Sequence, residues 1–204
     1  ADRMAFIRSH RQSPLALYVA NEMISKSFSV PATDLEEILA RNCRISDTAR
    51  AARFCRQAEQ ACYFCKDIHY PDVPLHTPTF DTTLLSAHIR PGHVTLIDCW
   101  ASWCGPCRAA IPKVKALYDK YGRDRFDVIS ISLDSKKEDW QKALEEEKMP
   151  WPQFIAGNRG YKQLTSRYNI SSIPNLILID GKGQVVCNTF SPEEIRIELE
   201  QILR

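Results

Sequence analysis

The last two-thirds of the chain alternates between two kinds of hydrophobic pattern. Apolar or alternating runs that predict β-strands lie at residues 93–100, 126–133, 175–180 and 184–188. Apolar residues at helical spacing predict three helices, over 105–121, from about 135, and from 191 to the C-terminus. The turn Gly181-Lys182-Gly183 between the last two strands favours an antiparallel hairpin. Alternating strands and helices indicate an α/β domain around a central sheet.

In the first third of the chain, the apolar residues recur only at the spacing of a helix. Helical segments are expected to begin near residues 14, 33 and 46. In the first of them, one face carries the apolar residues and is predicted to be the buried one: Leu15, Tyr18, Val19 and Met23. Together these segments predict a small all-helical unit over residues 1–69.

A proline-rich stretch separates the two patterns. Residues 70–78, "YPDVPLHTP", contain three prolines, and proline cannot continue a helix because it lacks the backbone N–H group. The stretch therefore predicts an extended linker. The expected organisation is a helical N-terminal unit over 1–69, a linker over 70–78 and an α/β domain over 79–204.

Composition narrows the classes of partner. The chain has 204 residues, 44% of them hydrophobic and 25% charged, which is typical of a soluble globular protein. Its 27 basic and 25 acidic residues give a formal charge of +2, so we expect no nucleic-acid partner. No apolar run approaches the roughly 20 residues needed to cross a bilayer, and the first ten residues lack the apolar segment of a signal peptide.

Two cysteines stand two residues apart in "DCWASWCGPCR", Asp98 to Arg108, where a predicted strand gives way to a predicted helix. A zinc site would need two more ligands at suitable spacing, and none follows within the domain, so no metal is expected. Cys104 falls at the first turn of the helix, where unpaired backbone N–H groups and the helix dipole favour a thiolate. A thiolate is the nucleophile of thiol-disulfide exchange. Cys107, one turn further in, is predicted to be the resolving thiol, and a purely structural bridge is the alternative.

Asp98 is a carboxylate in an otherwise apolar strand, six residues before Cys104. Burial would raise its pKa by desolvation. It could then accept the proton of Cys107 as that thiol becomes a nucleophile. The alternative is that Asp98 only accepts structural hydrogen bonds.

Several separated motifs carry a family resemblance. "WASWCGPCR", the pair Ile111-Pro112 and "SIPNLILIDGKGQVV" resemble, in order and spacing, the thioredoxin-like fold and within it the TlpA/ResA-like thiol-disulfide oxidoreductases. "SLDSKKEDWQKAL" and "MPWPQF" resemble an inserted segment of Bacteroidetes-type members, which often carry a helical N-terminal region. The resemblance covers about residues 78–204. It implies a central mixed sheet flanked by helices, preceded here by a small all-helical domain.

The resemblance also implies a function and a site. The Cys-Gly-Pro-Cys pair resembles that of members that reduce protein disulfides, and no cofactor is implied. The expected substrate-binding residues are Trp103, Gly105, Pro106, Ile173 and Pro174, with a cis peptide bond between the last two packed beside the cysteines. The expected partners are protein disulfides and a redox partner protein. The expected location is the periplasm or cell envelope, with any signal or membrane anchor lying before residue 1.

Other functions remain open at this point. A disulfide oxidase or isomerase would use the same cysteine pair at a higher redox potential. A thiol peroxidase on the same fold would need a threonine and an arginine around a single cysteine, which "WCGPC" does not resemble. A binding protein that keeps the pair as a structural bridge is the non-enzymatic alternative. The chain also departs from many TlpA/ResA-like proteins in having Ala110 where they have a glutamate, which would leave proton transfer to Asp98 alone.

The remaining cysteines have several interpretations. Four lie in the first third, at positions 43, 55, 62 and 65, the last two in a second C-x-x-C, "CYFC". They could be core thiols or a structural disulfide, an electron-relay pair that exchanges with Cys104 and Cys107, or metal ligands. Cys99 and Cys187 lie on predicted strands and are expected to be core residues.

Overall fold

The computed structural model describes residues 3–10, 14–25, 32–42, 68–122 and 125–203. The chain divides into two compact units, residues 1–68 and 69–204. The helix predicted from about residue 46 lies outside the described residues, as do the four cysteines at positions 43, 55, 62 and 65. Within the part that is described, no helix has both the length and the apolar character needed to cross a membrane.

The described part of the first unit is helical, as predicted. Its described helices are α1 (Arg3–Ser9), α2 (Pro14–Ser25) and α3 (Ala32–Asn42). The predicted buried face of α2 was partly wrong: Met23 is buried, but Leu15 and Tyr18 are 55% and 59% exposed. Ala16 and Ala20 are buried in their place. They share a face with Met23 because they precede it by seven and three residues.

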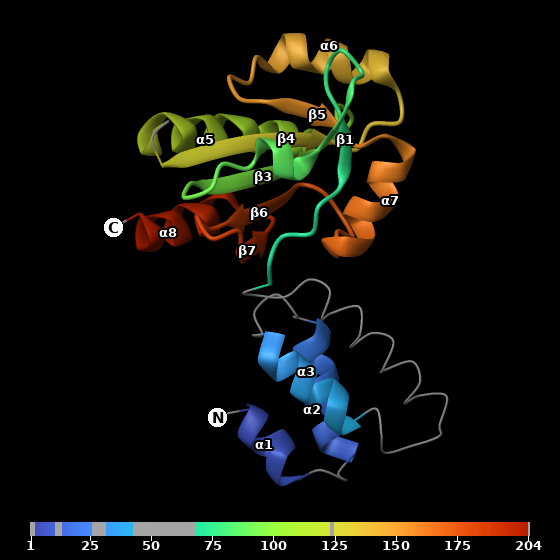
Figure 1. The fold of residues 1–204 in the computed structure, drawn as a ribbon, viewed down its shortest axis with the longest axis vertical. Coiled ribbons are helices and arrows are strands. Elements are labelled where there is room, and N and C mark those ends of the chain that lie inside the picture. The colour runs from blue at the N-terminus through green and yellow to red at the C-terminus, as the bar shows by residue number, and fades with distance from the viewer. Residues whose placement is uncertain (1–2, 11–13, 26–31, 43–67, 123–124, 204) are drawn as a thin grey trace. The chain divides into compact units, whose positions relative to one another are not determined.

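The second unit is built on a mixed sheet of seven strands. These are β1 (Pro74–His76), β2 (Thr82–Leu84), β3 (Val94–Trp100), β4 (Phe126–Ser132), β5 (Gln153–Ile155), β6 (Asn175–Ile179) and β7 (Val185–Thr189). Their order across the sheet is β2-β1-β5-β4-β3-β6-β7, with β3 and β4 in the interior (Figure 1). Strand β4 runs parallel to β3 and β5, whereas β6 runs antiparallel to β3 and β7. The four predicted strands and the predicted hairpin are confirmed.

The structure differs from the linker expected over residues 70–78. Within it, Pro74–His76 forms β1, which pairs with β2 and, through His76, with Ile155 of β5. Proline is compatible with this strand because Pro74 is its first residue. The three-residue strands β1, β2 and β5 are too short to show an alternating pattern in the sequence.

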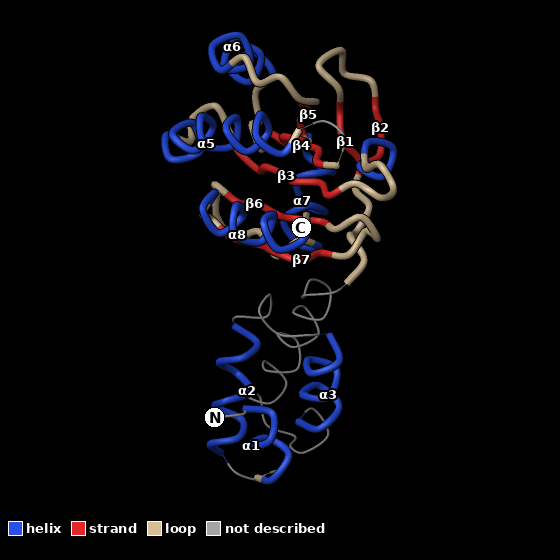
Figure 2. Tube along the Cα trace, turned by 90° about the vertical axis from the view of Figure 1, so that its left-hand side faces the viewer, coloured by secondary structure: helices blue, strands red, loops and turns tan. Residues whose placement is uncertain are grey.

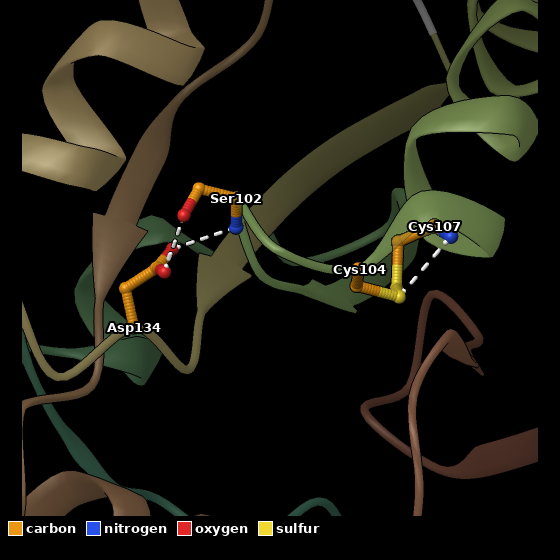
Figure 3. Close-up of a disulfide and its surroundings, with 4 residues drawn as sticks. All are labelled: Ser102, Cys104, Cys107 and Asp134. Carbon is orange, nitrogen blue, oxygen red and sulfur yellow. Dashed lines mark hydrogen bonds between the residues drawn. A yellow bond between two sulfur atoms is a disulfide. The ribbon is translucent and has the colours of Figure 1, made fainter.

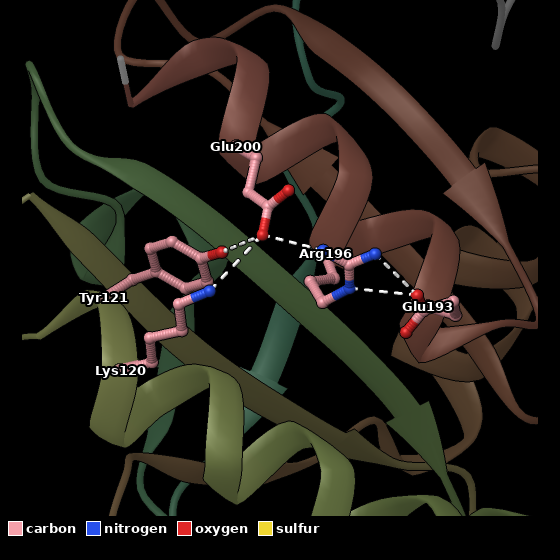
Figure 4. Close-up of polar contacts among 5 residues, drawn as sticks. All are labelled: Lys120, Tyr121, Glu193, Arg196 and Glu200. Atoms are coloured by element: carbon pink, nitrogen blue, oxygen red, sulfur yellow. Dashed lines mark hydrogen bonds and ion pairs between the residues drawn. The ribbon is translucent and has the colours of Figure 1, made fainter.

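Helices cover the sheet. They are α5 (Gly105–Tyr121), α6 (Lys137–Glu147), α7 (Gly157–Arg167) and α8 (Pro192–Ile202), with a short 3₁₀ helix at Leu85–His88. Helices α5, α6 and α8 lie on the same side of the strands (Figure 2). Three of the four helices were predicted; α7, which packs against β1, was not. The ends of α5 and α8 are joined at Glu200, which accepts hydrogen bonds from Arg196, Lys120 and Tyr121 (Figure 4).

Candidate active site

The cysteine pair occupies the start of α5 and forms a disulfide. Cys104 is the N-cap residue, and its Sγ accepts a hydrogen bond of 3.2 Å from the backbone N–H of Cys107 (Figure 3). The Cα atoms of the two residues are 5.2 Å apart. The exposed fractions are 5% for Cys104 and 2% for Cys107, so Cys104 is the more accessible. Because Cys104 is the N-cap residue, a negative charge on its sulfur would face the unpaired N–H groups of the first helical turn.

A buried aspartate fixes the loop that leads into this helix. Asp134, just after β4, accepts hydrogen bonds from the backbone N–H of Ser102 at 2.9 Å and from its hydroxyl at 2.7 Å (Figure 3). The hydroxyl of Ser132 donates a third bond, of 2.7 Å, to the same carboxylate. Ser102 is two residues before Cys104, so Asp134 holds the backbone that carries the first cysteine.

Asp98 lies on β3, on the face of the sheet that α5 covers. Trp100, two residues further along the strand, shares this face because strand side chains alternate. Trp100 packs in one buried cluster with Cys104 and Cys107. The carboxylate of Asp98 accepts a hydrogen bond of 2.8 Å from the hydroxyl of Ser130 on β4. Burial raises the pKa of Asp98 to about 6, and the bond from Ser130 partly offsets the rise.

The predicted substrate-binding residues lie around the disulfide. Trp103 is 69% exposed, and Gly105 and Pro106 are exposed beside it at the start of α5. Ile173 packs against the cluster that contains both cysteines. The expected cis peptide bond between Ile173 and Pro174 is present. The structure thus brings together the residues that the sequence pattern singled out, although they come from two separate segments, 98–107 and 173–174.

A shallow hollow of about 260 Å³ adjoins Trp103 on the side of α6. It is lined by Ser102, Trp103, Arg108, Asp139, Lys142, Ala143 and Glu146. Arg108, in the first turns of α5, is already bound to Glu146 at 2.7 Å and to Glu147 at 2.5 Å. These ion pairs join the start of α5 to α6.

The two other described cysteines are core residues. Cys99 is fully buried and belongs to no disulfide. It points to the face opposite Asp98, where Tyr168 lies close enough to interact with it. Burial raises the pKa of the Cys99 thiol well above its usual range. Cys187 is buried on β7. Among the described residues, no group of three or more His, Cys, Asp or Glu side chains could hold a metal ion.

The polar residues that support the site are not evident from the motifs of the sequence. Asp134, Ser102 and Ser130 were not singled out. A signal was present in "SIS", residues 130–132, because two serines occupy alternate positions at the end of a mainly apolar strand and therefore share one buried face. Buried hydroxyl groups need hydrogen-bond partners, so their presence predicts polar neighbours.

Comparison with known proteins gives matches to one family. The family model described as thioredoxin-like matches residues 92–185. The thiol-disulfide oxidoreductase ResA of Geobacillus kaustophilus is 26% identical over 133 residues, which cover 61% of this chain and 75% of that protein. The chain covers between 61% and 75% of the length of the first three curated relatives.

Solved structures agree with these matches. The thiol:disulfide interchange protein DsbE of Chlorobium tepidum is 32% identical, with a TM-score of 0.56 over 69% of this chain and 96% of that one. The thioredoxin domain of a thiol-disulfide oxidoreductase from Bacteroides vulgatus has the same fold, with a TM-score of 0.62, 24% identity and coverage of 68% and 98%. The predicted fold is thereby confirmed, and the chain belongs to the thioredoxin-like family of thiol-disulfide oxidoreductases.

Proposed function

We propose that the protein reduces disulfides of other proteins by dithiol-disulfide exchange through Cys104 and Cys107. The observation that carries the proposal is the placement of this pair at the start of α5, with Cys104 as N-cap residue and a buried carboxylate on the strand beneath the helix. A structural bridge would need no group able to exchange a proton near neutral pH, whereas a reaction that consumes and releases thiol protons does.

In the first step the Cys104 thiolate attacks one sulfur of the substrate disulfide. A mixed disulfide forms between Cys104 and the substrate, and the other substrate sulfur leaves as a thiolate. The N–H groups of the first turn of α5 stabilise the attacking charge; in the disulfide form, the N–H of Cys107 already donates to Cys104 Sγ.

In the second step Cys107 resolves the mixed disulfide. Asp98 accepts the proton of the Cys107 thiol, and the resulting thiolate attacks Cys104 Sγ. The bond between Cys104 and the substrate breaks, the second substrate thiolate leaves, and the Cys104–Cys107 disulfide seen in the structure forms. Two electrons pass from the enzyme dithiol to the substrate. A redox partner protein must then return two electrons to the pair.

The substrate is proposed to lie across the exposed surface around the pair. Trp103, with 69% of its surface exposed, offers a flat apolar contact beside Cys104. Gly105 and Pro106 leave the same area open, and Ile173 and Pro174 border the cysteine cluster from the other segment. The same proposal places the protein in the periplasm or cell envelope, the location expected from its resemblance to TlpA/ResA-like proteins.

Insulin reduction with dithiothreitol tests the activity. We expect the wild type to accelerate it and the Cys104→Ser variant to fall to the uncatalysed rate, because the attacking thiolate is gone. Cys187→Ser is the matched control, since it removes a buried thiol on β7 and should retain activity. An inactive wild type would favour a structural bridge instead.

The redox potential of the Cys104–Cys107 pair tests whether the protein reduces or oxidises its substrates. We expect a reductant, with a potential of about -270 mV. Equilibration with glutathione buffers, followed by mass spectrometry of Cys104 and Cys107, measures this potential. A value near about -120 mV would identify an oxidant and overturn the reductase proposal.

A further inference from the structure

Asp98 lies at the end of a short chain of hydrogen bonds that includes Ser130 and Trp151. Ser130 faces Asp98 in the pairing of β3 with β4, and its hydroxyl donates to Asp98 Oδ2 at 2.8 Å. The indole Nε1–H of Trp151 in turn donates to the hydroxyl oxygen of Ser130, also at 2.8 Å. The exposed fractions are 0% for Ser130 and 3% for Trp151, so water does not compete for these bonds.

The direction of this chain of hydrogen bonds is fixed by chemistry. An indole N–H group can only donate, so the oxygen of Ser130 must be the acceptor from Trp151. A hydroxyl has one proton, and that of Ser130 can reach either Asp98 or the sulfur of Met149, 3.9 Å away. A thioether is a weak acceptor and a carboxylate a strong one. The chain therefore runs from Trp151 through Ser130 and ends on the ionised carboxylate of Asp98.

The same residues are held against the redox site. Met149, the other neighbour of the Ser130 hydroxyl, packs on the cluster that contains Cys104 and Cys107. The ring of Trp151 lies 5.4 Å from that of Tyr118 on α5, the helix that begins at the cysteine pair. The Ser130 and Trp151 part of the chain of hydrogen bonds is thus packed against the parts of the fold that hold the disulfide.

We propose that Ser130 and Trp151 are positioning residues that keep Asp98 ionised, and so able to accept a proton, when Cys107 becomes the resolving nucleophile. The inference rests on the proposed role of Asp98 as the base. Burial disfavours the charge on Asp98, and the bond from Ser130 is the contact that opposes burial. Trp151 acts one step further away, because its donation to the oxygen of Ser130 polarises the hydroxyl and strengthens the bond that the hydroxyl donates to Asp98.

Ser130 is the described neighbour of Asp98 that stabilises its charge. Strand β6 places the apolar Leu176 opposite Asp98, and α5 contributes the uncharged cysteine pair. On β3, the neighbouring Cys99 stays protonated because burial raises the pKa of its thiol. Among the described residues, burial and the Ser130 hydroxyl are the influences that shift the pKa of Asp98.

The test is the pH dependence of the resolving step. The reduced full chain is mixed with a disulfide-containing peptide and quenched with acid, and mass spectrometry follows the conversion of the Cys104 mixed disulfide into the Cys104–Cys107 disulfide. In Ser130→Ala we expect the acid limb of this rate to move to higher pH by about one pH unit, since a hydrogen bond to a charged group is lost. In Trp151→Phe we expect a shift of about half a pH unit in the same direction.

Trp140→Phe is the matched control. Trp140 is also fully buried and packs in the cysteine cluster, but its Nε1 has no hydrogen-bond partner among the described residues. Its replacement should leave the midpoint of the acid limb in place. An equal shift in Trp140→Phe and Trp151→Phe would overturn the inference, because the loss of any buried indole would then suffice.

Asp98→Asn separates the two levels of the argument. If Asp98 is the base, this variant loses the acid limb. An acid limb that persists in Asp98→Asn overturns the role of Asp98 and the inference with it. If the limb disappears in Asp98→Asn, yet both Ser130→Ala and Trp151→Phe keep the wild-type midpoint, only the inference fails. Trp151→Phe retains most of the ring volume, so it also supplies the answer should Ser130→Ala not fold.

Discussion

Asp98 on β3 and Asp134, just after β4, are two buried carboxylates whose surroundings differ in one respect. Their exposed fractions are nearly equal, at 5% and 6%. Asp134 accepts three hydrogen bonds, two from Ser102 and one from Ser132. For Asp98 the structure shows one donor, Ser130. Equal burial therefore comes with very different compensation for the loss of water.

The difference separates a group that anchors the backbone from one that can exchange a proton. Three donors hold Asp134 in place and tie the loop before Cys104 to the end of β4. With a single donor, Asp98 is not fully compensated, and burial raises its pKa to about 6. A carboxyl with such a pKa can accept and release a proton near neutral pH. The number of donors, rather than burial, distinguishes the two roles.

Asp134→Ala should have the largest effect on stability. It leaves the backbone N–H and hydroxyl of Ser102 and the hydroxyl of Ser132 without their acceptor, which should cost about 4 kcal/mol at roughly 1–3 kcal/mol for each buried group. Urea unfolding of the disulfide form at pH 7 measures it. Asp98→Asn, measured alongside, should not lower the free energy of unfolding. Equal losses in the two variants would contradict the distinction between them.

The second-largest effect should be the pH dependence of the free energy of unfolding that ionisation of Asp98 causes. Its pKa is raised in the folded state, so the folded protein binds the proton more tightly than the unfolded chain. Below about pH 3 both states are protonated and Asp98 costs nothing. As the pH rises from about 4 to 6 the unfolded chain ionises first, so the stability of the wild type falls. Above the folded-state pKa of about 6, the cost is complete and constant.

The free energy of unfolding of the wild type, relative to Asp98→Asn, should thus fall by about 2 kcal/mol between pH 4 and pH 7, since the pKa changes from 3.8 to about 6 and the unfolded chain is already partly ionised at pH 4. Urea unfolding of both proteins at pH 4, 5, 6 and 7 gives the difference directly. A difference that stays constant over this range would show that the hydrogen bond from Ser130 fully compensates the burial of Asp98.

The sequence was sufficient to predict the parts of this site that lie close together along the chain. Asp98, Cys104 and Cys107 fall within ten residues, and their local pattern of strand followed by helix already places them. The long strands and most helices of the second unit were predicted for the same reason, because each contains its own hydrophobic period. Helix α7 was missed, since glycines at positions 157 and 160 and few apolar residues weaken its pattern.

Contacts across strands could not be predicted in this way. Ser130 meets Asp98 because β3 and β4 pair in a particular parallel register, which no local pattern specifies. Asp134 meets Ser102 for the same reason, as each follows the end of one of these strands. The polar residues that support the candidate site are therefore placed beside it by strand pairing, which a local sequence pattern does not specify.

Ser102→Ala should have the smallest effect, and it tests how the bonds to Asp134 divide their contribution. The variant removes the hydroxyl bond of 2.7 Å but keeps the backbone bond of 2.9 Å to the same carboxylate. Ser102 is only partly buried, so water can replace the lost donor, and we expect a loss of about 1 kcal/mol in urea unfolding. Ser132→Ala should cost more, because its fully buried hydroxyl also accepts from the backbone N–H of Asp134. If Ser102→Ala cost as much as Asp134→Ala, a single hydroxyl would hold the loop, and the number of donors would not explain the difference between the two aspartates.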